Sequence, residues 1–253
     1  MKILAINGSH RVGQNTDYLI NEALSAAAEL GAETEVIELS EKNIEYCTGC
    51  NRCLFKPECS IKDDDMEEIK QKMLEADGII MASPDYFSNV SGRMKTFIDR
   101  TRPMHMVANQ LKGKVAGCIT MAGLDNCGAE PTYAALSQFC STHEMIQINP
   151  RPEGPVIASV VAGSLMAGMK DGKPQWRRSV SEDPIAPAVA RQLGIDMVEL
   201  IKKLAECARF IGPRPQARKT IEHSLQASVS CGGFFVCASA ETIKRNDRSG
   251  KTE

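Results

Sequence analysis

The chain has 253 residues, of which 43% are hydrophobic and 25% charged, and its formal net charge is −2. This composition is that of an ordinary globular protein, and the near-neutral charge excludes a general basic field for nucleic acid. No apolar run approaches the roughly 20 residues that span a bilayer, and the N-terminus turns polar too soon for a signal peptide. We therefore expect a cytoplasmic protein with no nucleic-acid or membrane partner. In that reducing compartment, clustered cysteines indicate metal or redox chemistry rather than disulfides.

Strands and helices are expected to alternate over the first 150 residues. Short apolar runs, such as residues 3–6, suit strands that are buried on both faces of a parallel sheet. The expected strands are 2–7, 34–39, 78–83, 114–120 and 146–148, and the expected helices are 15–30, 63–76, 91–102 and 131–145. This alternation predicts an α/β fold, a doubly wound parallel five-stranded sheet of order 2-1-3-4-5.

The alternation is interrupted at residues 40–62 and ends after residue 149. Residues 40–62 form a cysteine-rich loop insertion, and the Gly- and Pro-rich residues 150–181 are expected to form an extended excursion. A helix from 183 to about 210 is expected to pack back on the sheet. The predicted organisation is one domain at 1–210 followed by a C-terminal extension at 211–253.

The loop after the first expected strand has the composition of a phosphate site. It connects a strand to a helix N-terminus, where free N–H groups attract phosphate. Gln14 and Asn15 stand where a Walker loop has Lys and Ser or Thr, and a Gly-x-Gly-x-x-Gly fingerprint is absent. A monophosphate such as that of FMN fits best, although a plain strand-to-helix turn stays an alternative. Asn15 or Thr16 is expected to cap the helix, and the candidate contacts are Ser9, Arg11, Gln14, Asn15 and Thr16.

Two further loops are expected at the same edge of the sheet. The loop after the third strand supplies two neighbouring aromatic residues and several polar groups, so a planar ring can stack there. Packing of these aromatics beneath the loop is the alternative. The loop after the fourth strand is expected to bound the far side of a flat ligand. The candidate contacts are Pro84, Asp85, Tyr86, Phe87, Ser88, Asn89, Ala122 and Gly123.

Four of the ten cysteines fall within residues 47–59, in the pattern C-x2-C-x2-C-x5-C. Three thiolates spaced by two residues can wrap three corners of a cubane cluster, and a local fourth completes it. A [4Fe–4S] cluster on Cys47, Cys50, Cys53 and Cys59 is therefore the preferred interpretation. Zinc and free or redox-active thiols are the alternatives. A helix with buried cysteines is disfavoured by Gly49 and its polar neighbours.

The remaining cysteines carry no compelling chemistry. Cys118, Cys140 and Cys207 lie in expected strands or helices and are predicted to be core residues. Cys127 is predicted to be a bystander thiol. A disulfide or extra ligand pair at Cys231 and Cys237 is disfavoured.

Taken together, these motifs resemble a known family. The segments are Gly8-Ser9-x-Arg11, Asn15-Thr16, Ser83-Pro84-x-Tyr86-Phe87, Val90-Ser91-Gly92 and Lys95-x-Phe97-Ile98-Asp99-Arg100. They are similar to the NADPH-dependent FMN reductase superfamily, and with the cysteine motif the chain resembles its iron–sulfur flavoproteins. The resemblance implies a flavodoxin-like fold, FMN at the three loops and a [4Fe–4S] cluster on the four cysteines. It also implies a homodimer or homotetramer, with the cluster loop near the subunit interface.

The function expected from this resemblance is electron transfer. Electrons from a ferredoxin-like or NAD(P)H donor would pass through the cluster and the flavin to an acceptor. This scheme requires no acid–base residue, so no catalytic residue is assigned. The alternatives are an NAD(P)H-dependent FMN or quinone-type reductase with a zinc or thiol site, and a non-enzymatic redox carrier or sensor.

Overall fold

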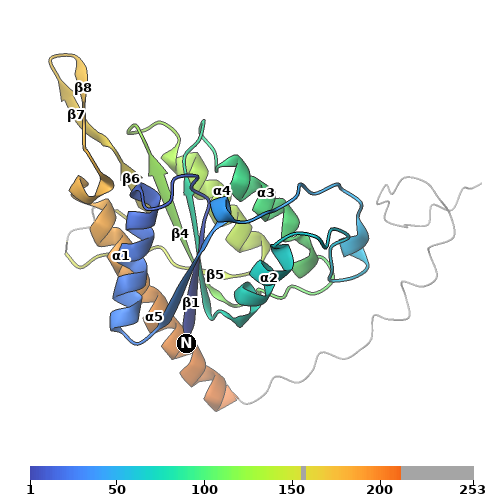
Figure 1. Cartoon of the computed structure of the whole chain (residues 1–253). Coiled ribbons are helices and arrows are strands. Elements are labelled where there is room, and N and C mark those ends of the chain that lie inside the picture. Colours follow the sequence, from blue (N-terminus) through green and yellow to red (C-terminus); the bar gives the residue numbers. More distant parts are fainter. Residues whose placement is uncertain (155–157, 212–253) are drawn as a thin grey trace, which may run out of the picture. The chain divides into compact units, whose positions relative to one another are not determined.

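A computed structural model describes residues 1–154 and 158–211 (Figure 1). The main sheet is parallel, with the order β2-β1-β3-β4-β5, which confirms the predicted topology. Its strands are β1 (Lys2–Asn7), β2 (Glu33–Glu38), β3 (Gly78–Pro84), β4 (Val115–Ala122), β5 (Ile146–Gln147) and β6 (Val161–Ser164). The helices are α1 (Asn15–Glu29), α2 (Met66–Glu75), α3 (Gly92–Arg100), α4 (Ala129–Thr142) and α5 (Ala186–Ile211).

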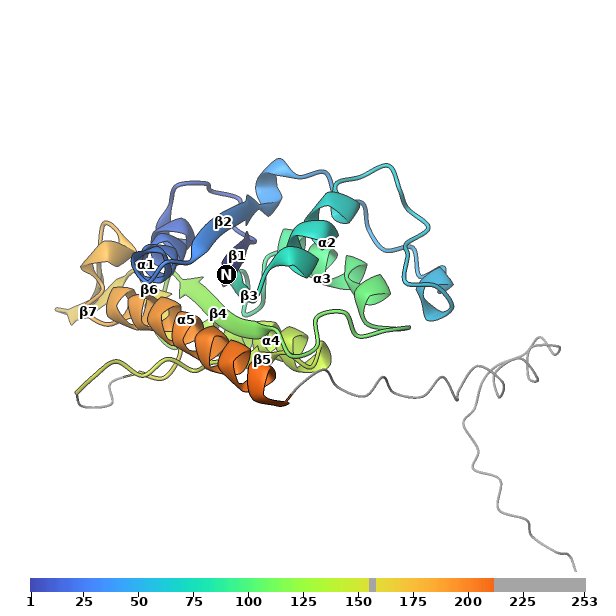
Figure 2. The same cartoon turned by 90° about the horizontal axis from the view of Figure 1, so that it is seen from below.

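The central strands are buried on both faces, as their apolar runs predict. Every residue of β3 and of β4 is buried. Helices α1 and α5 cover one face of the sheet, and α2, α3 and α4 cover the other (Figures 1 and 2). Removal of both faces from water supplies the main driving force for this fold.

Helices α1 and α5 pack closely at a glycine. A Cβ atom at Gly194 of α5 would lie 1.9 Å from the carbonyl oxygen of Ala23 in α1. Only glycine permits this approach, so the return of the last helix to the sheet depends on that residue. The expected helix at 183–210 is thus observed as α5, which begins three residues later.

The excursion at 150–181 holds more structure than its composition predicts. Strand β6 pairs in parallel with the second half of β4, while β5 pairs with the first two residues of β4. A hairpin of β7 (Met166–Lys170) and β8 (Lys173–Trp176) then follows. Small residues and long-range parallel pairing leave no local alternation, which is why the sequence did not predict these strands.

No helix in the described part of the chain is long and apolar enough to cross a membrane. Short 3₁₀ turns connect several elements: η1 (Leu39–Glu41), η2 (Arg52–Leu54), η3 (Arg102–Met104) and η4 (Val180–Glu182). The predicted extension at 211–253, with Cys231 and Cys237, lies almost entirely outside the described residues, which end at residue 211.

Candidate functional site

Hydrogen bonds join the three predicted loops at the carboxyl edge of the sheet. The Gly8 amide donates to the Ala82 carbonyl at 2.8 Å, and the Ser91 hydroxyl donates to the Gly8 carbonyl at 2.6 Å. The Asp85 amide donates to the Met121 carbonyl at 2.7 Å, which ties the second loop to the end of β4, where the third loop begins. The tertiary structure therefore brings together the loops that the sequence placed at one edge.

The first loop leads to a helix N-terminus that no described side chain caps. Gln14 occupies the cap position of α1, so the prediction that Asn15 or Thr16 caps it is wrong. The Asn15 side-chain oxygen instead accepts from the Val180 amide at 2.9 Å, which anchors η4 to this loop. The first-turn amides of α1 thus have no side-chain acceptor, an arrangement that suits a phosphate.

Asn7 and Asp17 support the first loop, and the sequence analysis missed both. The Asp17 carboxylate accepts from the Gly13 amide and from the Asn7 side chain. Asn7 also donates to Glu38 at 2.8 Å and accepts from the Ser9 amide at 2.9 Å. Burial, reinforced by the negative charge of Asp17, raises the pKa of Glu38 to about 7. A buried Asn at a strand end beside an acidic first helical turn was the available signal.

The second loop presents its aromatic residues outward. Tyr86 is partly exposed and Phe87 is fully exposed, so the alternative of packing beneath the loop does not hold for Phe87. Phe87 and Ser88 both adopt positive φ angles, of 55° and 62°. Such backbone is costly for bulky residues and is concentrated at functional sites. The Tyr86 ring stacks on His10 of the first loop, with ring centroids 6.3 Å apart.

The predicted cofactor contacts divide into buried and accessible side chains. The buried ones shape the loops, and they are Ser9, Thr16, Pro84 and Ala122. The accessible or partly accessible ones face solvent, and they are Arg11, Gln14, Asn15, Asp85, Tyr86, Phe87, Ser88, Asn89 and Gly123. Asp85 is also engaged within the protein, because its carboxylate accepts from the Thr132 hydroxyl at 2.9 Å.

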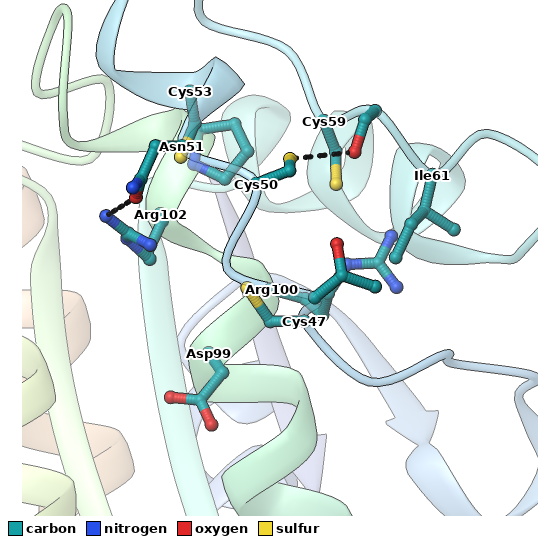
Figure 3. A pocket seen from close by; sticks show the side chains of 12 residues that line it. Cys47, Cys50, Asn51, Cys53, Cys59, Ile61, Asp99, Arg100 and Arg102 are labelled. Carbon is teal, nitrogen blue, oxygen red and sulfur yellow. Dashed lines mark hydrogen bonds between the residues drawn. The ribbon is translucent and has the colours of Figure 1, made fainter. Parts of the chain in front are cut away.

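A second site lies in the cysteine-rich loop. All four cysteines of the motif line one pocket, which holds about 330 Å³ of space including the part open to solvent (Figure 3). Cys53 is buried, Cys59 is half-buried, and Cys47 and Cys50 are exposed. Arg100 and Arg102 line the same pocket, from the end of α3 and from η3.

The backbone of the cysteine loop is irregular, as its composition predicts. Gly49 and Asn51 adopt left-handed φ angles of 67° and 60° between the cysteines. The 3₁₀ turn η2 carries Cys53, and residues 42–51 form no helix. The interpretation as a helix with buried cysteines is therefore excluded.

Positive charge and hydrogen-bond donors surround the thiols. The Ser60 hydroxyl lies 3.0 Å from the Cys50 sulfur, and this hydrogen bond and the Arg52 amide lower the pKa of Cys50. These contacts therefore favour the thiolate form of Cys50, the form that binds metal.

The cysteine sulfurs are spread around the pocket. Within residues 1–154 and 158–211, no three His, Cys, Asp or Glu side chains converge on a point where one metal ion would sit. In an iron–sulfur cluster each thiolate binds a different iron, so four sulfurs around one pocket fit that group. The all-cysteine donor set also matches the ligands that such clusters take.

Helix α3 connects the two sites. Its cap, Ser91, binds the first loop, and its last residues, Asp99 and Arg100, line the cysteine pocket. Nine residues at a rise of 1.5 Å place the two ends about 13 Å apart. A Cβ at Gly8 would lie 2.8 Å from the Cβ of Met94, so glycine is needed where this helix meets the first loop.

Among the described cysteines outside the motif, the core prediction holds for two and fails for one. Cys118 and Cys140 are buried with their sulfurs 3.8 Å apart, as expected of core residues. Cys127 is exposed in the loop after β4. Cys207 is also exposed, so its assignment to the core is wrong, because residues 202–207 of α5 are all exposed.

Known proteins share both the fold and the sequence pattern. Residues 1–151 match the family described as NADPH-dependent FMN reductase. An "Iron-sulfur flavoprotein" of Methanocaldococcus jannaschii is 37% identical over 202 residues, which cover 80% of this chain and 98% of that protein. Another of the same name from Archaeoglobus fulgidus is 37% identical over 209 residues, covering 81% and 100%.

Solved structures show the same fold at low identity. A crystal structure of RosB with bound 8-demethyl-8-formylriboflavin-5'-phosphate aligns with a TM-score of 0.62 at 16% identity, covering 96% of this chain and 100% of that one. A WrbA-like flavodoxin from Agrobacterium tumefaciens aligns with a TM-score of 0.50 at 15% identity, covering 80% and 97%. The chain thus belongs to the NADPH-dependent FMN reductase family, among its iron–sulfur flavoproteins, and is an FMN-dependent oxidoreductase with a flavodoxin-like fold.

Proposed function

We propose that the protein transfers electrons from a ferredoxin-like or NAD(P)H donor to an acceptor by means of a [4Fe–4S] cluster and FMN. The cluster ligands are Cys47, Cys50, Cys53 and Cys59. The observation that carries the proposal is the pocket that all four cysteines line at the end of α3. The names of the relatives, iron–sulfur flavoproteins, support the cluster.

FMN binds at the three joined loops in this proposal. The first-turn amides of α1 hold the phosphate, with Ser9, Arg11, Gln14, Asn15 and Thr16 around it. The second and third loops hold the flavin ring through residues 84–89, Ala122 and Gly123. The exposed positive-φ tip at Phe87 and the Tyr86–His10 stack support a ring-binding role for the second loop.

The bound groups supply the redox chemistry: the cluster transfers single electrons, and FMN exchanges one or two. The chain's own residues fix the two sites at opposite ends of α3. Buried Ser91 ties the helix to the flavin loop, and buried Arg100 holds its other end against the cysteine loop by donating to the Glu45 carbonyl at 2.7 Å. The cysteine thiols lose their protons on binding metal, and the hydrogen-bond donors around Cys50 favour that loss there.

A homodimer or homotetramer is part of the proposal. Large apolar side chains are exposed within the cysteine-rich loop, with Tyr46 at 78% and Phe55 at 74%. Exposed aromatic groups of this size are typical of protein interfaces. A second copy covering them would bring the cysteine loop of one subunit against its partner. We further propose a cytoplasmic location and a domain at 1–210 followed by an extension at 211–253.

Anaerobic purification followed by metal, sulfide and flavin analysis tests the cofactors. About four iron and four sulfide per chain, with FMN, are expected. Zinc without sulfide would instead support a reductase with a zinc site, and a protein unable to retain added FMN would contradict the three-loop site.

Turnover separates an enzyme from a carrier. Reduced ferredoxin and NADPH are each mixed with the anaerobic protein and a quinone acceptor. Catalytic reduction of the quinone supports the proposal. Reduction of the bound groups without turnover would favour a redox carrier.

A further inference from the structure

Arg100 is the charged side chain buried most completely beside the cysteine pocket. Its side chain is 1% exposed, and it lines the same pocket as Cys47, Cys50, Cys53 and Cys59 (Figure 3). Arg102, which lines the pocket as well, is half-buried and donates to the Asn51 side chain at 3.3 Å. Solvent therefore screens Arg102 far more than Arg100.

The contacts of Arg100 orient its guanidinium. Nη1 and Nη2 donate to the Asp64 carboxylate, and Nη1 also donates to the Glu45 carbonyl. Nε is buried and finds no hydrogen-bond partner among the described residues. A buried N–H without a partner is costly, so this donor is available to an acceptor in the pocket.

Asp64 pairs with the guanidinium and is also 1% exposed. It does not line the pocket of the four cysteines, which Arg100 does, although both residues line a neighbouring pocket together with Cys59. The buried pair is thus a dipole whose positive end faces the pocket that all four cysteines line. A cluster bound by four thiolates is negative and gains a further negative charge on reduction, so this end stabilises the reduced form more.

We infer that Arg100 sets the reduction potential of the cluster held by the four cysteines, holding it more positive than the thiolates alone would. This inference rests on the proposed cluster site. Arg100 acts as a positioning and electrostatic residue: its charge favours the reduced state, and so would a hydrogen bond from the unpartnered Nε to a cluster sulfur.

Three variants and one control test the sign of this effect. Arg100→Gln removes the cation, and the ratio of reduced to oxidised cluster at a fixed potential should fall at least tenfold, equivalent to about 59 mV for one electron. Asp64→Asn leaves the cation uncompensated, so the potential should rise. Arg100→Lys keeps the charge and should restore most of the wild-type potential. The control, Arg102→Gln, should shift the potential less than Arg100→Gln.

The potential is measured by anaerobic titration, with the EPR signal of the reduced cluster as the readout. Opposite shifts in R100Q and D64N support the inference, because a merely structural role would not reverse its sign. Equal shifts, or none, overturn it. Should a single variant fail to fold, the double variant D64N/R100Q removes both charges together. Its potential must still fall below that of the wild type, because the positive end of the pair faces the cysteines.

Iron and sulfide analysis of the wild type distinguishes a failure of the proposed function from a failure of the inference about Arg100. A wild-type protein with no iron–sulfur cluster overturns both the proposed function and this inference. A wild type that holds the cluster, but whose potential is unaffected by Arg100, overturns the inference alone.

Discussion

Cys53, which lies in η2, is the most deeply buried of the four cysteines. Serine cannot replace thiolate as an iron ligand of comparable strength, so Cys53→Ser should reduce the iron content from about four per chain to below one. FMN content should be retained, because the flavin loops lie at the other end of α3. Metal analysis and the visible spectrum measure both.

Cys207→Ser provides the matched control for this prediction. Cys207 is exposed on α5, which packs on the opposite face of the sheet from α3. Its replacement should leave iron and flavin unchanged. Equal iron loss in both variants would contradict the assignment of ligands.

Glu38 is expected to make stability depend on pH. Its pKa is about 7 in the folded protein against a usual value of 4.5, so between these values the folded state binds more protons than the unfolded state. Stability should therefore fall as pH rises from about 4.5 to 7. Glu38→Gln should stabilise the protein at pH 8 by on the order of 1 kcal/mol, after allowance for screening at this half-buried site.

Urea unfolding at pH 5 and pH 8 checks this prediction. At pH 5 the glutamine variant and the wild type should differ little, because Glu38 is already protonated in the folded state. Glu33→Gln, at an exposed position of the same strand, is the control and should show no such pH dependence. A stabilisation of equal size at both pH values would disprove the role of burial.

At the scale of elements, α3 is held in place by its cap. The Ser91 hydroxyl accepts from the Met94 amide at 3.1 Å and donates to the Gly8 carbonyl at 2.6 Å. Ser91→Ala removes the cap and leaves a buried carbonyl without its donor. The free energy of unfolding should fall by about 1–2 kcal/mol, and FMN should bind more weakly because the first loop loses this anchor.

Thr96→Ala separates the cap from a general effect on the helix. The Thr96 hydroxyl donates to the Gly92 carbonyl within α3 and contacts neither loop through a hydrogen bond. Its loss should change stability by less than about 0.5 kcal/mol and leave FMN affinity unchanged. Fluorescence titration with FMN and urea unfolding are sufficient for both variants.

At the scale of the whole molecule, self-association should depend on the apolar rim of the cysteine loop. Tyr46→Ser combined with Phe55→Ser removes two large exposed aromatic groups and should shift the assembly toward monomer. Analytical ultracentrifugation measures this shift. Trp176→Ser, at a similarly exposed aromatic on β8, is the control and should leave the assembly intact. A wild type that is monomeric at micromolar concentration would contradict the proposed oligomer.

Much of the fold was predictable, because the sequence patterns that define its strands, helices and turns lie within short segments of the chain. The buried runs of β3 and β4 and the turns between elements carry their own periodicity, and these define a doubly wound sheet. Strand β6 and the hairpin were not predicted. Their residues are small or polar, and the parallel pairing of β6 with β4 bridges about forty residues that contain a helix.

The sequence by itself determined which groups the protein is expected to bind. The spacing of four cysteines and the composition of the first loop are both local patterns, which can be recognised from neighbouring residues along the chain. Only the tertiary structure decided what surrounds that chemistry. It paired Asn7 with Asp17 beneath the first loop, and it buried Arg100 against Asp64 beside the cysteines. These partners lie 10 and 36 residues apart. The physical reason is that charges and buried donors act through space, across strands and helices that no local pattern connects.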